Sequence, residues 1–289
     1  MSTRRGNQPL HPAEDVSGPP VKPMRVKAIW TIAIRRSFKL FLQIVFAFVV
    51  LSAVLRGMLG ERKTAAKVQG GAEKVTEESL LAYILGYTGV SLIFATYCAV
   101  LGLKGWFFDK DINSVSASQL HRLYARSAVA ERLCIATAAY ETFNVVAVLV
   151  LPEYRSVAYI GHHVTTLVLS VLAFHPWCHY YIIFFFGVAT TSSLPLCMFE
   201  SLDALGWYSA ADAVKPLFAV SFLAIRTAYW PLVSLGFWQD ALWALSSRKS
   251  RVHSTGAYIL LMVANIGLTS LQFLWTGEIA KGIAKFMQD

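Results

Sequence analysis

Long apolar runs dominate the chain, and their length limits the folds that it can adopt. Apolar residues make up 56% of the 289 positions and charged residues only 15%, whereas soluble proteins carry roughly 25% charged residues. A helix needs about 20 apolar residues to cross the hydrocarbon core of a bilayer. Seven runs approach or exceed that length, at residues 38–57, 80–103, 131–151, 157–174, 178–198, 214–237 and 256–277. The sequence therefore predicts a membrane protein.

These runs predict an all-α fold, a polytopic transmembrane helix bundle with seven spans. Apolar residues are continuous within each run, whereas the strands of a membrane barrel alternate apolar and polar residues. The third run is the most interrupted, because Glu131, Arg132, Glu141 and Asn144 fall inside it. If that run did not span the membrane, six spans would remain.

The chain divides into three parts. Residues 1–36 are rich in proline and basic residues, so we expect a disordered tail. Residues 37–79 contain the first transmembrane anchor and a loop, and residues 80–289 contain the main bundle. Basic residues are more numerous on the side of the N-terminus, so the positive-inside rule places that terminus in the cytoplasm. Because the net charge of +9 is concentrated in segments that flank spans, it favours a membrane partner and not nucleic acid.

One polar stripe crosses the third run. Thr137, Glu141 and Asn144 are four and three residues apart, so they share a helix face, and Tyr140 is adjacent. Ionisable groups within a bilayer are costly and usually mark a functional site in the protein interior. Glu141 is therefore a candidate catalytic residue, and Tyr140 and Asn144 are candidate substrate-binding residues. The alternative is a hydrogen-bonded carboxyl that only joins helices.

Two adjacent histidines, His162 and His163, lie in the fourth run. Neighbouring residues on a helix point about 100° apart, so the two rings cannot face one spot. A turn at residues 152–155 would make the third and fourth runs antiparallel and place Glu141 within about 6 Å of the depth of His162. A carboxylate–imidazole pair there could serve as a general base, which makes both histidines catalytic candidates. Thr166 stacks with both and is a candidate binding residue; the alternative is a pair of core histidines.

Arg226 lies near the middle of the sixth run, five residues before Pro231. A buried guanidinium needs a counter-charge. Glu141, an anionic headgroup or the phosphate of an acyl-CoA could supply it, so Arg226 is a candidate substrate-binding residue. In the alternative, its side chain extends to the membrane surface.

The histidines do not have the spacing of a metal site. His175 and His179 are four residues apart, but Pro176 between them predicts a turn and not a helix. His162 and His175 are 13 residues apart, which is about 20 Å along a helix. We therefore expect no metal and no bound cofactor.

Several of these residues together resemble the TLC-domain family, the membrane fold shared by ceramide synthases and several lipid-linked proteins. The motifs that carry the resemblance are Tyr140-Glu141, His162-His163-Val-Thr-Thr-Leu, Ser192-Ser193-Leu-Pro-Leu and the segment from Phe222 to Arg226. The resemblance covers roughly residues 80–277 and implies a TLC-like bundle in residues 80–289. It also implies a place in the endoplasmic reticulum or another endomembrane, and acyl-CoA as a co-substrate if the protein is an enzyme.

The chain departs from the ceramide synthases after the histidine pair. Those enzymes carry a His-Asp and a further Asp in that segment, whereas residues 189–193 are Ala-Thr-Thr-Ser-Ser here and hold no ionisable group. The Glu that the non-synthase branch usually has near Thr191 is absent too, and Glu141 stands where the family typically has Asp. These departures count against synthase activity.

Three functions remain open. The first is a TLC-type protein that binds acyl lipid or sphingolipid inside the bundle and influences membrane lipid composition, with or without catalysis. The second is an acyl-CoA-dependent N-acyltransferase in which His162 or His163 deprotonates the amine or carries the acyl group. The third is a transporter or a seven-helix receptor; a retinal protein would need a lysine in its last span, and residues 256–277 contain none. The oligomeric state also stays open.

Overall fold

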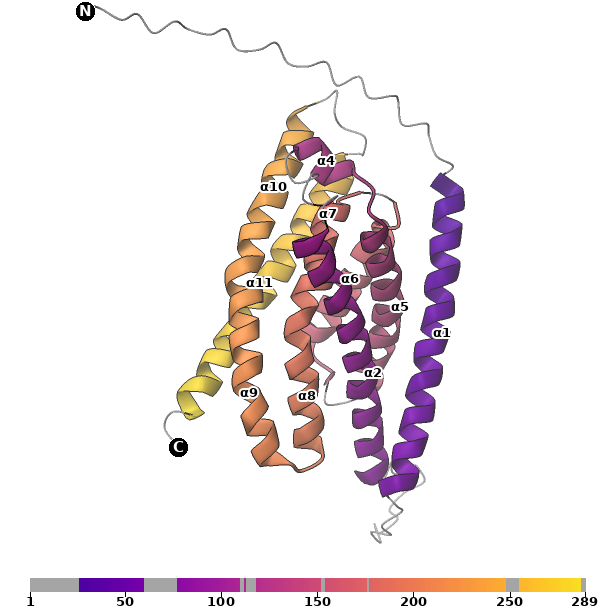
Figure 1. Ribbon diagram of the computed structural model, residues 1–289, viewed down its shortest axis with the longest axis vertical. Helices are drawn as coiled ribbons and strands as arrows, with labels where there is room; N and C mark the ends of the chain where they lie inside the picture. Colours follow the sequence, from indigo (N-terminus) through magenta and orange to yellow (C-terminus); the bar gives the residue numbers. More distant parts are fainter. Residues whose placement is uncertain are drawn as a thin grey trace, which may run out of the picture.

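The computed structural model describes residues 26–59, 77–109, 112, 118–151, 154–175, 177–247 and 255–286. Within this part of the chain the fold is a helical bundle without strands, which confirms the all-α prediction (Figure 1). Among the described residues, six helical segments are long and apolar enough to cross a membrane. Four of them are α1 (Val26–Leu59), α2 (Glu77–Leu103) with its extension η1 (Lys104–Phe108), α5 (Ala128–Val150) and α11 (Thr255–Phe286).

The other two long spans each combine several helix types. One contains α7 (His179–Ile182), η3 (Ile183–Gly187), η4 (Val188–Ser192) and α8 (Ser193–Ala204). The second contains α9 (Tyr208–Phe222), η5 (Leu223–Tyr229) and α10 (Trp230–Ser246). η3 and η5 are wide π-helical turns and η4 is a tighter 3-10 helix. Such departures from α geometry inside a helix often accompany functional sites.

A seventh, shorter helix, α6 (Val157–Leu172), has 16 residues. α5 and α7 begin at the same end of the bundle, because the backbone N–H of Ser127 donates to Nδ1 of His179 over 3.1 Å. α6 must therefore run back along the bundle, from the end of α5 to the start of α7. The start of α1 and the end of α11 lie at opposite ends of the bundle (Figure 1). The third run, predicted to be the weakest, is thus the unbroken helix α5. The fourth is the short one, because Pro176 disfavours helix in the residue before it.

The predicted boundary at residue 36 lies inside a helix, because α1 already begins at Val26. Arg35, Arg36 and Lys39 are exposed along this helix. Their long side chains can reach the headgroup layer while the backbone stays helical, so a basic segment does not have to end the helix. Residues 1–25 and 60–76 lie outside the described residues, and the predicted disorder of the tail stays a prediction.

The backbones of α2 and the end of η3 come into direct contact at a pair of glycines. A Cβ added to Gly102 would lie 2.3 Å from the carbonyl carbon of Gly187, and a Cβ added to Gly187 would lie 2.5 Å from Cα of Gly102. Helices in lipid gain little from hydrophobic burial and associate through such close contacts between small residues. α2 and the α7–α8 span are therefore fixed against each other and form one wall of the interior.

An ion pair fixes the end of the bundle that holds α4 (Gln119–Tyr124). Arg122 donates from Nε and Nη2 to the two carboxylate oxygens of Asp240 on α10, over 2.7 Å each, and Tyr181 donates to the same carboxylate over 2.5 Å. Asp240 is only 1% exposed. The hydrogen bonds to its carboxylate raise the pKa of the Arg122 guanidinium. α4, α7 and α10 are thereby held together by a bidentate contact, the strongest form of such pairs.

Candidate functional site

A cavity of about 450 Å³ lies among the helices, with residues of α2, α5, α6, the α7–α8 span, the α9–α10 span and α11 in its wall. Most of these residues are apolar or aromatic, and polar side chains reach the cavity at a few points. This volume and this lining are typical of sites for apolar small molecules that are oriented by a few polar groups.

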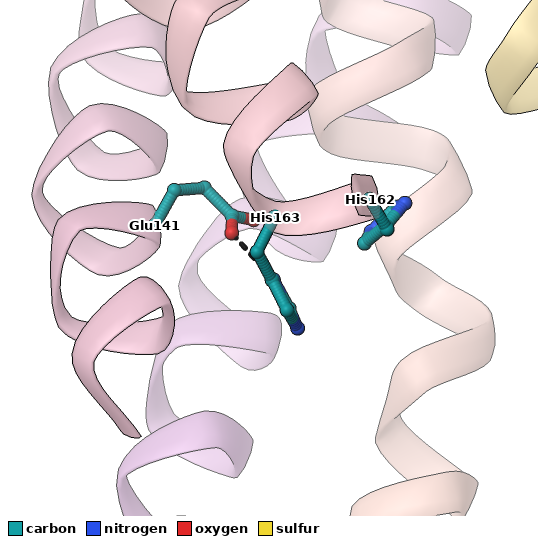
Figure 2. Close-up of side chains that lie close together, drawn as sticks. All are labelled: Glu141, His162 and His163. Atoms are coloured by element: carbon teal, nitrogen blue, oxygen red, sulfur yellow. Dashed lines mark hydrogen bonds and ion pairs between the residues drawn. The ribbon is translucent and has the colours of Figure 1, made fainter. Parts of the chain in front are cut away.

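Glu141 of α5 and His163 of α6 meet at this cavity. Oε2 of Glu141 lies 2.6 Å from Nδ1 of His163, and both side chains are buried (Figure 2). With Nδ1–H donated to the carboxylate, Nε2 of His163 is left as a proton acceptor. The ring of His162 lies beside that of His163 (Figure 2), with ring centroids 5.1 Å apart, and among the described residues its buried Nδ1 has no hydrogen-bond partner. The site therefore holds one oriented imidazole and a second with an unused nitrogen.

The short connection between α5 and α6 sets this register. Nη2 of Arg155 donates to the carbonyl oxygen of Leu149 over 2.5 Å, which satisfies the last turn of α5. The hydroxyl of Ser156 accepts from the backbone N–H of Tyr159 over 3.1 Å and so caps the start of α6. α5 ends and α6 begins close to the turn. The antiparallel pairing predicted from the sequence therefore brings Glu141 opposite the histidines.

Tyr140 and Thr166, both predicted to bind substrate, line the cavity. The Tyr140 hydroxyl donates to Ser91 of α2 over 2.7 Å, and its ring stacks on Phe94 with centroids 3.8 Å apart. The Thr166 hydroxyl donates to the carbonyl oxygen of His162 over 2.9 Å. Both hydroxyl groups thus already have hydrogen-bond acceptors within the protein, so these side chains contribute mainly to the shape of the cavity.

Asn144 shares a helix face with Glu141, as predicted, and its role in substrate binding stays a prediction. It is fully buried and is not among the residues that line the cavity. Its Nδ2 lies 3.4 Å from Oε2 of Glu141, within the same helix. Asn144 is one helical turn from Glu141 and therefore donates a hydrogen bond to its carboxylate.

Arg226 reaches the cavity from η5 and is held by neutral partners. Nε donates to Ser192 over 2.8 Å, Nη2 to Ser193 over 3.2 Å and Nη1 to Gln272 over 3.4 Å. Among the described residues no carboxylate forms an ion pair with it. Glu141, one of the predicted counter-charges, pairs with His163 instead.

The wide turn at Arg226 has a cause in the sequence. Pro231 occupies the first turn of α10, directly after η5. A proline lacks the backbone N–H of an α-helix and its ring crowds the carbonyl four residues earlier, at Thr227. A π-helical turn before the proline relieves that contact and presents Arg226 to the cavity.

Several residues of the site were not predicted as site residues from the sequence. Ser192 and Ser193 hold Arg226, in the same segment that lacks the acids of ceramide synthases. Trp275 of α11 lies against His162, with ring centroids 5.4 Å apart. Glu200 of α8 lines the cavity. Ser192 and Ser193 belong to a motif of the family resemblance, and Glu200 is an acid just beyond an apolar run, so these three carried a sequence signal; Trp275 carried none.

Glu141, His162 and His163 have the geometry of a possible metal site, since their ligand atoms lie within 4.8 Å of one another. The carboxylate oxygen nearest the histidines is already bonded to Nδ1 of His163. That bond orients an imidazole, as carboxylates do for catalytic histidines. The sequence prediction that no metal binds stays a prediction.

A family model described as the TLC domain matches residues 86–281, which is about two thirds of the chain. The matched segment contains the cavity residues of α5 and α6 as well as Arg226, and it begins after α1. A search of curated proteins returned no match.

Proposed function

Because the chain belongs to the TLC-domain family, we propose that it binds an acyl lipid, such as a sphingolipid, in the cavity between its helices. The acyl chain would lie against the apolar wall and the polar part would lie among Glu141, His163 and Arg226. By withdrawing or converting such a lipid, the protein would influence the lipid composition of its membrane. We place it in the endoplasmic reticulum or another endomembrane, with a cytoplasmic N-terminus.

The polar groups must determine which lipid is bound. An acyl chain in the bilayer is already surrounded by hydrocarbon, so its transfer into an apolar cavity changes the hydrophobic free energy little. A hydrogen bond to a charged group contributes about 1.5–3 kcal/mol. The charged side chains of the cavity are therefore the main source of selectivity.

The observation that carries the proposal is the guanidinium of Arg226, which reaches the cavity and has only neutral partners among the described residues. Burying a charge without a counter-charge is costly. A carboxylate or phosphate of the bound lipid would supply the missing charge. We therefore propose an anionic group on the ligand, placed at Arg226.

Mass spectrometry of lipid that remains bound during purification tests this proposal. We expect wild-type protein to retain a narrow set of anionic acyl lipids and Arg226→Gln to lose them. Arg126→Gln is the matched control, because Arg126 is half exposed and pairs with Glu131 outside the cavity. Retained lipid that mirrors the bulk membrane equally in all three proteins would refute the proposal.

A second candidate function is N-acyl transfer from acyl-CoA to a long-chain amine. The observation that favours it is the 2.6 Å contact between Glu141 and His163, next to the unpartnered Nδ1 of His162. Nε2 of His163 would take a proton from the amine as its nitrogen attacks the thioester carbonyl. The C–N bond forms, the C–S bond breaks, and coenzyme A leaves as its thiol after taking up the proton.

Incubation of purified protein with a sphingoid base and acyl-CoA decides between the two candidates. N-acyl product that disappears in His163→Ala would establish the transferase. If no product forms and selective lipid retention persists, lipid binding without transfer is supported. Residues 189–193 contain no ionisable group, whereas the ceramide synthases carry acids in this segment. This difference favours the second outcome.

A further inference from the structure

Three tyrosine rings and one carboxylate gather in the cavity wall near the turn between α5 and α6. Tyr87 of α2, Tyr154 of the turn, Tyr159 of α6 and Glu200 of α8 all line the cavity. The ring centroids of Tyr87 and Tyr154 lie 4.6 Å apart, and those of Tyr154 and Tyr159 lie 6.4 Å apart. The hydroxyl of Ser201, the residue after Glu200, donates to the hydroxyl of Thr88, the residue after Tyr87, over 2.8 Å, so Glu200 and Tyr87 lie on facing turns of α8 and α2.

Glu200 has no counter-charge in the part of the chain that the structure describes. It is partly buried, and no basic side chain there forms an ion pair with it. Arg226 of η5 also reaches the cavity, but its guanidinium contacts α8 at Ser193. Seven residues separate Ser193 from Glu200, which is about 10 Å along a helix, too far for an ion pair. The two charges therefore mark different points of the same cavity.

The surroundings of Glu200 fit an organic cation. The face of an aromatic ring attracts an ammonium group within about 6 Å of its centroid, and a carboxylate supplies the full opposite charge. A calcium or magnesium ion would require about six oxygen ligands, whereas a single carboxylate lies at this point. An organic ammonium group, such as a protonated amine, is the ligand group that these side chains fit.

We propose that Tyr87, Tyr154, Tyr159 and Glu200 form a subsite for the ammonium group of a long-chain amine or amine-bearing lipid. This inference rests on the proposed function, because it assumes that lipid occupies the cavity. The ring centroids of Tyr159 and His163 lie 6.4 Å apart, so a bound ammonium group lies about one helical turn from the Glu141–His163 pair. The cavity then receives an anion at Arg226 and a cation at Glu200.

Binding of three probes with the same hydrocarbon chain tests the subsite: hexadecylamine, hexadecyltrimethylammonium and hexadecanol. The purified full chain in neutral lipid nanodiscs is titrated with each probe, and tryptophan fluorescence is followed, since Trp275 lies 6.0 Å from the ring of Tyr159. We expect an ammonium probe to bind wild-type protein at least about tenfold more tightly than hexadecanol, which corresponds to about 1.4 kcal/mol. Empty nanodiscs correct for partition into lipid.

Variants locate the effect. Glu200→Gln should lower the affinity for the ammonium probe about tenfold and leave hexadecanol unchanged. Glu278→Gln is the matched control, because Glu278 also lines the cavity but is 69% exposed and pairs with Lys281 over 2.7 Å. An equal loss in the two variants, or an equal loss for amine and alcohol, would overturn the assignment to Glu200.

The wild-type comparison separates the remaining outcomes and needs no variant to fold. Tighter binding of hexadecylamine points to a primary amine that donates to the carboxylate, and tighter binding of the trimethyl probe points to a choline-like headgroup; each supports the subsite. Amine and alcohol that bind equally refute the subsite but leave lipid binding intact. If neither these probes nor hexadecanoate bind, the proposed function itself fails.

Discussion

Replacing Arg226 by glutamine tests whether a ligand anion neutralises the buried guanidinium. An arginine carries five N–H donors, and three are used by Ser192, Ser193 and Gln272. Two donors remain, enough for a bidentate contact with a carboxylate or phosphate. One charge-assisted hydrogen bond contributes about 1.5–3 kcal/mol, so the loss of even one should weaken binding by roughly 10- to 150-fold.

The assay compares hexadecanoate with hexadecanol on wild-type protein and on Arg226→Gln. We expect the variant to lose affinity for the acid and to keep its affinity for the alcohol, because the apolar wall is unchanged. Arg226→Lys should fall between the two, since lysine restores the charge without the planar fork.

The thermal stability of the free protein provides an independent check. An uncompensated buried charge is costly, so Arg226→Gln should unfold at the same temperature as wild-type protein or at a higher one. Equal losses for the acid and the alcohol, or a large drop in thermal stability, would contradict the reasoning. Either result would mean that Arg226 has a structural role.

Three further substitutions test the remaining contacts. Gly187→Ala places a methyl group about 2.5 Å from Cα of Gly102, and we expect a loss on the order of 1–3 kcal/mol, seen as a lower unfolding temperature; an unchanged temperature would contradict the tight crossing. Arg122→Met leaves the buried Asp240 without its cation and should cost about 3–5 kcal/mol, which denaturant titration can measure; a change near zero would contradict a buried ion pair. Glu141→Ala removes the partner of the imidazole, so if N-acyl transfer is observed, kcat should fall at least about 100-fold. KM for acyl-CoA should change little, and a fall in affinity alone would argue for a binding role.

The number and type of helices were largely predictable from the sequence, because a bilayer allows few backbone structures and each one needs a long apolar run. Helix continuity was harder to predict. α5 is unbroken although it contains Glu131, Arg132 and Glu141. Glu141 points into the bundle, where it meets His163, whereas Glu131 lies in the first turn of the helix and pairs with the exposed Arg126. α1 begins at Val26, earlier than the predicted anchor at residue 37, because the basic segment before the apolar run was assigned to the tail.

The centre of the site was also partly predictable. The spacing between Glu141 and the histidines is enough to bring them together once a short turn is assumed. The partners of Arg226 were not predictable, because serine and glutamine are common in membrane helices and carry no distinctive pattern. The π-helical turn was hidden for a related reason, since an apolar run looks the same at 3.6 and at 4.4 residues per turn.

The wide turn η5 has a consequence for how relatives of this protein can diverge. A π-turn holds one residue more than the α-turn that it replaces. Deleting one residue between Leu223 and Tyr229 would restore a regular helix, in which α9 and α10 keep their relative orientation and only the side chains presented at the turn change. The cavity could therefore be reshaped through single-codon insertions and deletions, while the apolar character that keeps the helix in the membrane is preserved. An alignment of homologues would then show one-residue gaps within this span.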